Sequence, residues 1–387
     1  MKVLWLCSWY PNEKDPFDGD FIERQARALS LYQHVDVIHI VQNIHLLNNE
    51  ELKVEENHEK NLHKKVYYLP HSFKEIKFLQ KLIFNTRYNS LFKKVLSDYI
   101  TINGKPDIVH VHVPVKAGVS ALWLKTKYNI PFVITEHSSA YFETIPENYF
   151  SRNNYFKFIT KQTLQQAEVV SSVSNWLLSR LNDLFAIKHS KLIRNAVDIS
   201  LFYPVKSLNK KKRFIHVSMM HPLKNVSGIL CALAVLNKTT TEWEMSFIGP
   251  ASKENLKLSF DLGLSKQIAW KGALPYCEVA KEMQQANVLI HFSKYENLPC
   301  VVNEALCCGL PVISSNVGGI SELVNDSNGI LVENENIDQL ANEIASYLQH
   351  PDRFNQQLIS TSASAMFNYN FIGNEMMQLY KDVLKKD

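Results

Sequence analysis

The chain has 387 residues, of which 46% are hydrophobic and 21% charged, and its formal net charge is +4. This length exceeds one ordinary hydrophobic core, so we expect two domains in a chain with the composition of a soluble globular enzyme. The sequence holds no run of about 18 apolar residues, so we expect no transmembrane helix.

The N-terminal residues predict a cytoplasmic protein. A strand is expected at residues 3–9, and Pro11, Asn12, Glu13 and Lys14 follow where a signal peptide would need small cleavage-site residues. The six cysteines form no C-x-x-C pair, as expected for reduced thiols.

The first strand is followed by a polar loop and by a helix expected at residues 21–31. At the start of that helix Gly19 would let the backbone approach a ligand, and Asp18 and Asp20 are candidate caps. Neither G-x-G-x-x-G nor G-x-x-x-x-G-K-[ST] occurs, so dinucleotide-dependent oxidoreductases and P-loop NTPases lack support.

A second strand is expected at residues 35–41, and a polar loop with strand edges at 46–65. Residues 72–98 are basic and rich in aromatic side chains. The basic members are Lys74, Lys77, Lys81, Arg87, Lys93 and Lys94. Such a region can lie on an anionic membrane, although two helices packed on the core with solvated lysines explain the same pattern. No recognition motif supports nucleic-acid binding.

Histidines mark the next two predicted strands. His110 and His112 share one face of a strand at residues 107–113, but no third ligand accompanies them, so we expect no metal. A strand at 130–135 delivers His137 to its carboxyl end, where open α/β sheets bind ligands. The alternative is a histidine satisfied by a neighbouring loop. Further strands are expected at 169–173 and, as the last of the domain, at 192–195.

The pattern restarts after a polar, basic linker at residues 206–213. A strand at 214–219, a loop at 221–225 and a helix at 227–236 repeat the opening unit. We therefore predict two Rossmann-like halves, with a further strand at 245–248 and a strand followed by a loop at 268–274 in the second.

Residues 288–313 read as a strand, a loop, a helix and a second strand, with Gly309 as the helix stop. A helix that begins near Pro299 would point its free N–H groups at an anion. Glu296 and Glu304 would then accept hydrogen bonds from hydroxyls on either side of a phosphate, which is the order of groups in a nucleotide sugar. The alternative is a surface loop with two solvated acids.

These two glutamates, with seven residues between them, resemble the E-x7-E signature of family-4 glycosyltransferases. Residues 195–204, 317–322 and 328–332 fit further family motifs in the same order. The resemblance implies a GT-B fold of the α/β class, in which two doubly wound Rossmann-like domains face each other across a cleft. We expect an N-terminal acceptor domain at 1–205, a donor domain at 206–366, and a helix at 367–387 that returns to the N-terminal domain.

The resemblance also implies roles for single residues. Glu296 would hold sugar hydroxyls, Glu304 the ribose and Lys224 the diphosphate, while His137 and Gly19 organise the reacting face. Further donor contacts are expected at Asn297, Leu298, Pro299 and Val301, and at Leu274 in the loop that receives the base.

One departure from the family concerns the diphosphate clamp. The family pairs a lysine with an arginine five residues earlier, and that position holds Met219 here. His221 lies nearby and is our candidate for a partial substitute.

The expected reaction is transfer of a sugar, with retention of configuration, from a nucleotide-diphosphate sugar to an acceptor hydroxyl. The donor is a co-substrate, and no other cofactor and no metal are expected. The acceptor would be a sugar or a lipid-linked saccharide in bacterial cell-surface polysaccharide or glycolipid synthesis, reached in the cytoplasm or peripherally on the inner membrane. Two alternatives are a glycoside hydrolase that uses Glu296 and Glu304, and a catalytically silent GT-B binding protein.

Overall fold

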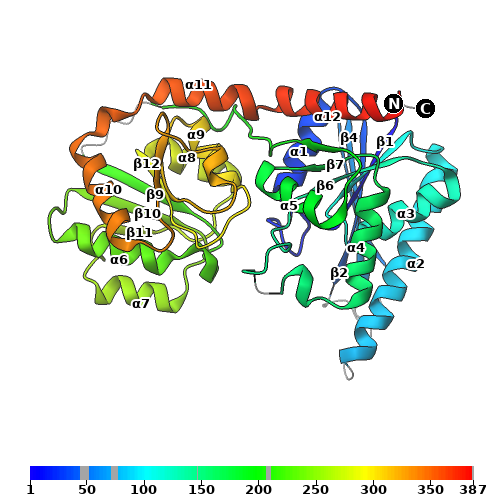
Figure 1. The fold of residues 1–387 in the computed structure, drawn as a ribbon, viewed down its shortest axis with the longest axis horizontal. Coiled ribbons are helices and arrows are strands. Elements are labelled where there is room, and N and C mark those ends of the chain that lie inside the picture. Colours follow the sequence, from blue (N-terminus) through cyan, green and yellow to red (C-terminus); the bar gives the residue numbers. More distant parts are fainter. Residues whose placement is uncertain (44–51, 71–76, 146, 206–210, 386–387) are drawn as a thin grey trace. The chain divides into compact units, whose positions relative to one another are not determined.

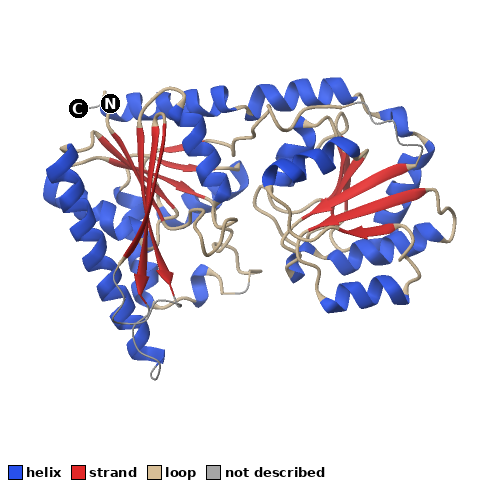
Figure 2. Ribbon diagram, turned by 180° about the vertical axis from the view of Figure 1, so that it is seen from behind, coloured by secondary structure: helices blue, strands red, loops and turns tan. Residues whose placement is uncertain are grey.

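The computed structural model describes residues 1–43, 52–70, 77–145, 147–205 and 211–385, and the side chains of residues 43 and 77–82 are outside that description. Its contacts divide the chain into two units. Unit 1 comprises Met1–Ala196 and Tyr369–Asp387, and unit 2 comprises Val197–Asn368. Each unit is built on one sheet flanked by helices (Figures 1 and 2), which confirms the prediction of two Rossmann-like halves.

Unit 1 holds an eight-stranded sheet in the order β3-β4-β2-β1-β5-β6-β7-β8, which is parallel except for the antiparallel β3–β4 pair. Its strands are β1 Val3–Cys7, β2 Val35–Asn43, β3 Lys53–Glu59, β4 Leu62–Pro70, β5 Ile108–His112, β6 Phe132–Glu136, β7 Val170–Ser172 and β8 Ser190–Leu192. Its helices are α1 Asp20–Ser30, α2 Lys77–Asn103, α3 Ala117–Tyr128, α4 Asn154–Gln166, α5 Asn175–Phe185 and α12 Tyr369–Leu384, with a 3-10 turn η1 at Tyr149–Ser151.

Helices cover both faces of this sheet, and β1 shows why. Leu4 and Leu6 pack with α2 to α5 on one face, whereas Val3, Trp5 and Cys7 pack with α1 and α12 on the other. Because successive strand residues point to opposite faces, a continuous apolar run is what a strand buried on both sides requires. The C-terminal α12 lies alongside α1 within this unit (Figure 1).

Unit 2 holds a six-stranded, fully parallel sheet in the order β11-β10-β9-β12-β13-β14. Its strands are β9 Lys212–Val217, β10 Trp243–Ile248, β11 Ile268–Trp270, β12 Val288–His291, β13 Val312–Ser315 and β14 Gly329–Val332. Its helices are α6 Val226–Asn237, α7 Lys253–Asp261, α8 Tyr276–Gln285, α9 Cys300–Cys307, α10 Ile337–Gln349 and α11 Gln356–Phe367, with 3-10 turns η2 Pro222–Lys224, η3 Ile320–Glu322 and η4 Pro351–Arg353.

Three predicted elements differ from the structure. The loop with strand edges expected at 46–65 overlaps the β3–β4 hairpin, which extends to Pro70 and whose charged side chains suit an exposed sheet edge. Residues 46–51 fall outside the described part. The last strand of unit 1 is β8, which ends where 192–195 was expected to begin. The expected helix pair at 72–98 is one helix, α2, from residue 77 onward.

The division between the units also comes earlier than the boundary expected after residue 205. Phe202 is fully buried and its ring lies 4.7 Å from that of Tyr276 in α8, so the segment before the polar linker packs with unit 2. Among the described residues, no helix has both the length and the apolar composition needed to cross a bilayer.

Candidate active site

The candidate site in unit 2 lies where the order of its strands reverses. Chain order proceeds from β9 outward through β10 and β11, and then from β12 outward on the other side. Residues 214 and 288 pair directly across β9 and β12. Loops that leave the carboxyl ends of two such neighbours diverge and leave a crevice between them, which is the ligand site of open α/β sheets.

Those two loops carry Lys224 and Glu296. The Lys224 Nζ donates to Glu296 Oε1 over 2.5 Å, and the backbone N–H of Lys294 donates to the Leu223 carbonyl over 2.8 Å. The structure therefore brings together the cation and the carboxylate that the sequence placed 72 positions apart.

A histidine at the end of β12 completes this cluster. His291 Nε2 lies 2.8 Å from Glu296 Oε1 and 3.2 Å from Ser293 Oγ, and its side chain is fully buried. Burial of Glu296 opposes its ionisation, but the Lys224 ammonium and the His291 imidazole lower the pKa of this carboxyl well below its usual range. Glu296 is therefore an anion throughout the physiological pH range.

The backbone that carries Glu296 is held by the glycine loop after β13. The Gly319 N–H donates to the Asn297 carbonyl over 2.9 Å, and Gly318 has a φ of +57°. A β-carbon at Gly318 would lie 1.8 Å from the Glu296 carbonyl oxygen, so no larger residue fits without moving one of the two loops.

The second glutamate sits on α9, which begins directly after Pro299. Glu304 is buried, with 3% of its surface exposed. The three residues before the helix are buried as well: Asn297, Leu298 and Pro299. Val301 is half-buried in the first turn. The carboxylate of Glu304 is thus set inside the unit rather than on a solvated loop, which disfavours the alternative of two ordinary surface acids.

The remaining unit 2 candidates are more exposed. His221 caps η2, where its Nδ1 accepts from the Leu223 N–H over 3.4 Å. Met219, at the position of the family arginine, is 57% exposed, and Leu274 is half-buried after β11. No arginine of this loop can take the place of the family arginine in the diphosphate clamp, because the described residues 218–225 contain none.

In unit 1, Gly19 and His137 follow the carboxyl ends of β1 and β6. Gly19 begins α1 with a φ of +64°, and a β-carbon there would lie 2.8 Å from the Trp9 carbonyl carbon. Beside it, Asp20 pairs with Arg24 over 2.6 Å, and burial with the nearby Asp15 charge raises the pKa of Asp18 to about 6.

His137 is buried beside a second histidine. Its Nε2 lies 3.3 Å from His112 Nδ1 and its ring 4.7 Å from that of Phe21, and burial lowers its pKa to about 3. The imidazole is therefore neutral. The preceding Glu136 accepts from Tyr141 and from two backbone N–H groups, and burial raises its pKa to about 7.

Sequence reasoning missed two neighbours of the predicted residues. His291 reads as one polar residue in an apolar strand, and its only signal was its place at that strand's carboxyl end. His112 was considered as a metal pair with His110, but His110 instead contacts the Tyr380 and Thr135 hydroxyls through its two ring nitrogens.

Comparison with known proteins agrees with this architecture. The family model described as Glycosyltransferase Family 4 matches residues 44–201, and the model described as Glycosyl transferases group 1 matches residues 202–363. A putative teichuronic acid biosynthesis glycosyltransferase, TuaC of Bacillus subtilis, is 24% identical over 90% of this chain and 89% of its own. The N-acetyl-alpha-D-glucosaminyl L-malate synthase of Bacillus anthracis is 25% identical over 73% of this chain and 76% of its own.

Solved structures share the fold. Sucrose-phosphate synthase from Thermosynechococcus elongatus superposes with a TM-score of 0.80 at 19% identity and covers 100% of both chains. Anabaena HepE in complex with UDP superposes with a TM-score of 0.73 at 18% identity, over 99% of this chain and 100% of that one. Two family models that follow each other along the chain, and a shared fold of two Rossmann-like sheets, lead to one conclusion: the chain belongs to the family-4 glycosyltransferases of the GT-B fold.

Proposed function

We propose that this glycosyltransferase moves a sugar from a nucleotide-diphosphate sugar to an acceptor hydroxyl with retention of configuration, in the synthesis of a cell-surface polysaccharide or glycolipid. The observation that carries the proposal is the Lys224–Glu296 ion pair at the strand-order reversal of unit 2. A cation beside a carboxylate and a helix N-terminus offers one partner to a diphosphate and another to sugar hydroxyls.

In this scheme each side chain meets a different part of the donor. Lys224 and the first N–H groups of α9 stabilise the departing diphosphate, Glu296 orients the transferred sugar, and Glu304 accepts from the ribose hydroxyls. No residue is assigned as a covalent nucleophile, so the leaving phosphate oxygen takes the proton of the acceptor hydroxyl on the same face of the sugar. His137 is neutral and would contribute a hydrogen bond rather than a charge at the reacting face.

Two of the similar proteins support this choice of donor and acceptor. TuaC is described as a putative teichuronic acid biosynthesis glycosyltransferase, and HepE was solved with UDP. A polysaccharide or glycolipid acceptor and a uridine donor are therefore the first combination to assay.

The glycoside hydrolase alternative fits the site less well. A hydrolase needs one carboxylic acid that remains protonated until it donates to the leaving group. Glu296 does not fit that role, because Lys224 and His291 keep its pKa low. A hydrolase would therefore have to use Glu304 as the acid and would leave Lys224 without a phosphate to bind.

Nucleotide release from a panel of UDP-, GDP- and ADP-sugars tests the function. We expect one donor to be turned over, faster when an acceptor saccharide is added, with an α-linked product from an α-linked donor by NMR. Glu296→Gln and Lys224→Ala should both lower turnover strongly. A folded wild-type chain that neither binds nor cleaves any donor would establish a silent binding protein, and sugar release without nucleotide would establish a hydrolase.

We further propose that the protein docks peripherally on an anionic membrane surface. In the described part of α2, Tyr88 and Phe92 are buried in the core of unit 1, which agrees with a core-packed helix, while Lys93 and Lys94 are exposed. The side chains of Lys74, Lys77 and Lys81 lie outside the described residues. Each lysine near an anionic surface contributes about 1 kcal/mol. Replacement of these three by glutamate should therefore abolish flotation with anionic liposomes, and equal flotation of wild type and variant would leave only the core-helix interpretation.

A further inference from the structure

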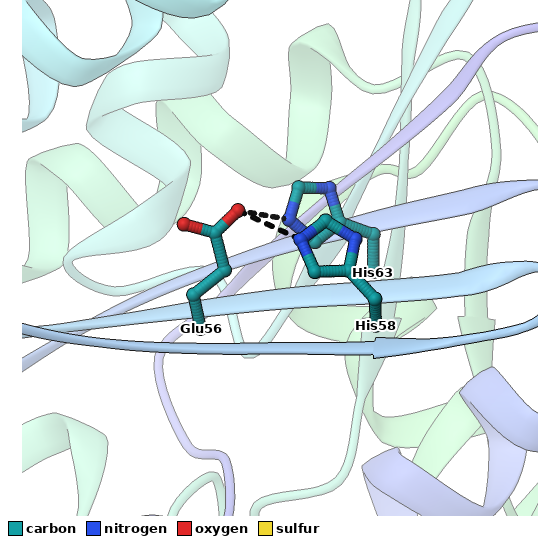
Figure 3. Close-up of side chains that lie close together, drawn as sticks. All are labelled: Glu56, His58 and His63. Carbon is teal, nitrogen blue, oxygen red and sulfur yellow. Dashed lines mark hydrogen bonds and ion pairs between the residues drawn. The ribbon is translucent and has the colours of Figure 1, made fainter.

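The β3–β4 hairpin of unit 1 gathers three side chains with metal-ligating atoms. Glu56 and His58 lie two positions apart on β3, so they share one face, and His63 on β4 pairs directly with His58 in the antiparallel register. Figure 3 shows both imidazoles turned toward the same carboxylate. None of the three has a place in the proposed sugar transfer.

The distances within this cluster are short. Glu56 Oε1 lies 2.9 Å from His58 Nε2 and 2.8 Å from His63 Nε2, and the two rings stack with centroids 3.8 Å apart. The three candidate ligand atoms all lie within 4.8 Å of one another. Two imidazole nitrogens and one carboxylate oxygen are a ligand set that zinc takes, with a fourth position left open.

A second observation concerns the other ring nitrogen of His63. His63 Nδ1 lies 3.1 Å from Asp36 Oδ1, and Asp36 Oδ2 accepts from the Tyr99 hydroxyl over 2.6 Å. Asp36 is buried on β2, the next strand of the sheet. A carboxylate that receives Nδ1–H fixes the ring orientation and leaves Nε2 as the basic atom, which is the arrangement found behind metal-bound histidines.

This arrangement has an electrostatic consequence. A neutral His63 that donates Nδ1–H to Asp36 presents the lone pair of Nε2 to the Glu56 oxygen only 2.8 Å away. Two acceptors at that distance repel unless a cation lies between them. The cation is either a second proton on the ring or a metal ion.

We propose that Glu56, His58 and His63 bind one divalent transition-metal ion of the zinc class, with a water molecule completing its coordination. Because the ligands come from both strands, the ion would cross-link edge strand β3 to β4. Lys65 is the built-in competitor, since its Nζ lies 3.0 Å from the same Glu56 oxygen. A glutamate side chain is ordinarily ionised at neutral pH, so the carboxylate is available to a metal.

The test uses the full-length chain stripped with a chelator, with Zn²⁺ titrated by calorimetry and Co²⁺ as the spectroscopic probe. We expect one ion per chain, visible d–d bands of a tetrahedral Co²⁺ complex, and a raised Tm on Zn²⁺ addition. His58→Ala, His63→Ala and Glu56→Gln should each weaken binding by about tenfold or more and remove the Co²⁺ bands. Lys65→Met should tighten binding, because it removes the competing ammonium.

His34→Ala is the matched control. His34 Nε2 lies 3.3 Å from the same Asp36 oxygen, but His34 is not one of the three proposed ligands. Its replacement should therefore leave Zn²⁺ affinity unchanged. Circular dichroism of each variant in chelator establishes folding. The proposal fails if folded wild type binds no Zn²⁺, which would leave a shared proton as the cation. It also fails if His58→Ala and His63→Ala bind Zn²⁺ as wild type does, or if His34→Ala loses as much affinity as they do.

Discussion

Replacement of Lys224 by methionine should destabilise unit 2 by removing the counter-ion of a buried carboxylate. The Glu296 side chain is 9% exposed and that of Lys224 27% exposed. Loss of one partner of a fully buried ion pair costs about 3–5 kcal/mol. His291 still contacts Glu296 in the variant, and position 224 is partly open to water, so we expect the cost of one charged hydrogen bond, about 2 kcal/mol.

The pH dependence identifies the carboxylate as the cause. The folded pKa of Glu296 is lowered, so the pair contributes its full stabilisation above the unfolded value of about 4.3 and loses it as the pH falls through the folded pKa. The stability difference between wild type and Lys224→Met should therefore be constant from about pH 8 to pH 5 and should shrink below about pH 4.

Thermal unfolding of the full chain measures this difference. For a domain of this size, about 2 kcal/mol corresponds to a fall in Tm of about 4–8 °C at neutral pH. The double variant with Glu296→Gln should lose less than the two single variants together, since it leaves no unpaired charge. Lys257→Met is the control, because its pair with Asp261 is exposed and contributes about 0.5 kcal/mol at most. The reasoning is refuted if both lysine variants lower Tm equally, or if the difference persists unchanged at acid pH.

Three further substitutions test the candidate site. Gly318→Ala should lower kcat/KM by displacing the Glu296 backbone. Gly263→Ala is the control: this glycine also has a positive φ, but a β-carbon there would meet nothing within 4 Å, so the variant should carry only backbone strain. Equal activities of the two variants would contradict the close-packing argument. Glu304→Ala should weaken binding of the free nucleotide about tenfold or more while the chain remains folded, and unchanged calorimetric affinity would remove its ribose role. His221→Ala should reduce donor affinity, because the imidazole would no longer donate a hydrogen bond to the diphosphate. An affinity equal to that of wild type would return His221 to an ordinary capping residue.

The parallel architecture and much of the site could be read from the chain. Apolar runs such as residues 3–7 and 288–292 are typical of strands buried on both faces, and their alternation with helical periodicity predicts parallel sheets. Glu296, Glu304 and Lys224 were identified by spacing and family resemblance, because a loop that ends in a helix has a local sequence signature. The β3–β4 hairpin was missed, since the charged residues of an edge strand resemble those of a loop.

Tertiary structure alone decided which of these residues meet. Lys224 and Glu296 form an ion pair because β9 and β12 are neighbours in the sheet although three helices and two strands separate them in the chain. His291 touches Glu296, and His63 lies between Asp36 and Glu56, through pairings that no local pattern encodes. Periodicity reports which face of an element is buried, whereas strand order and register depend on the packing of the whole unit. The charge state of Glu296 follows from that packing and not from its position in the sequence.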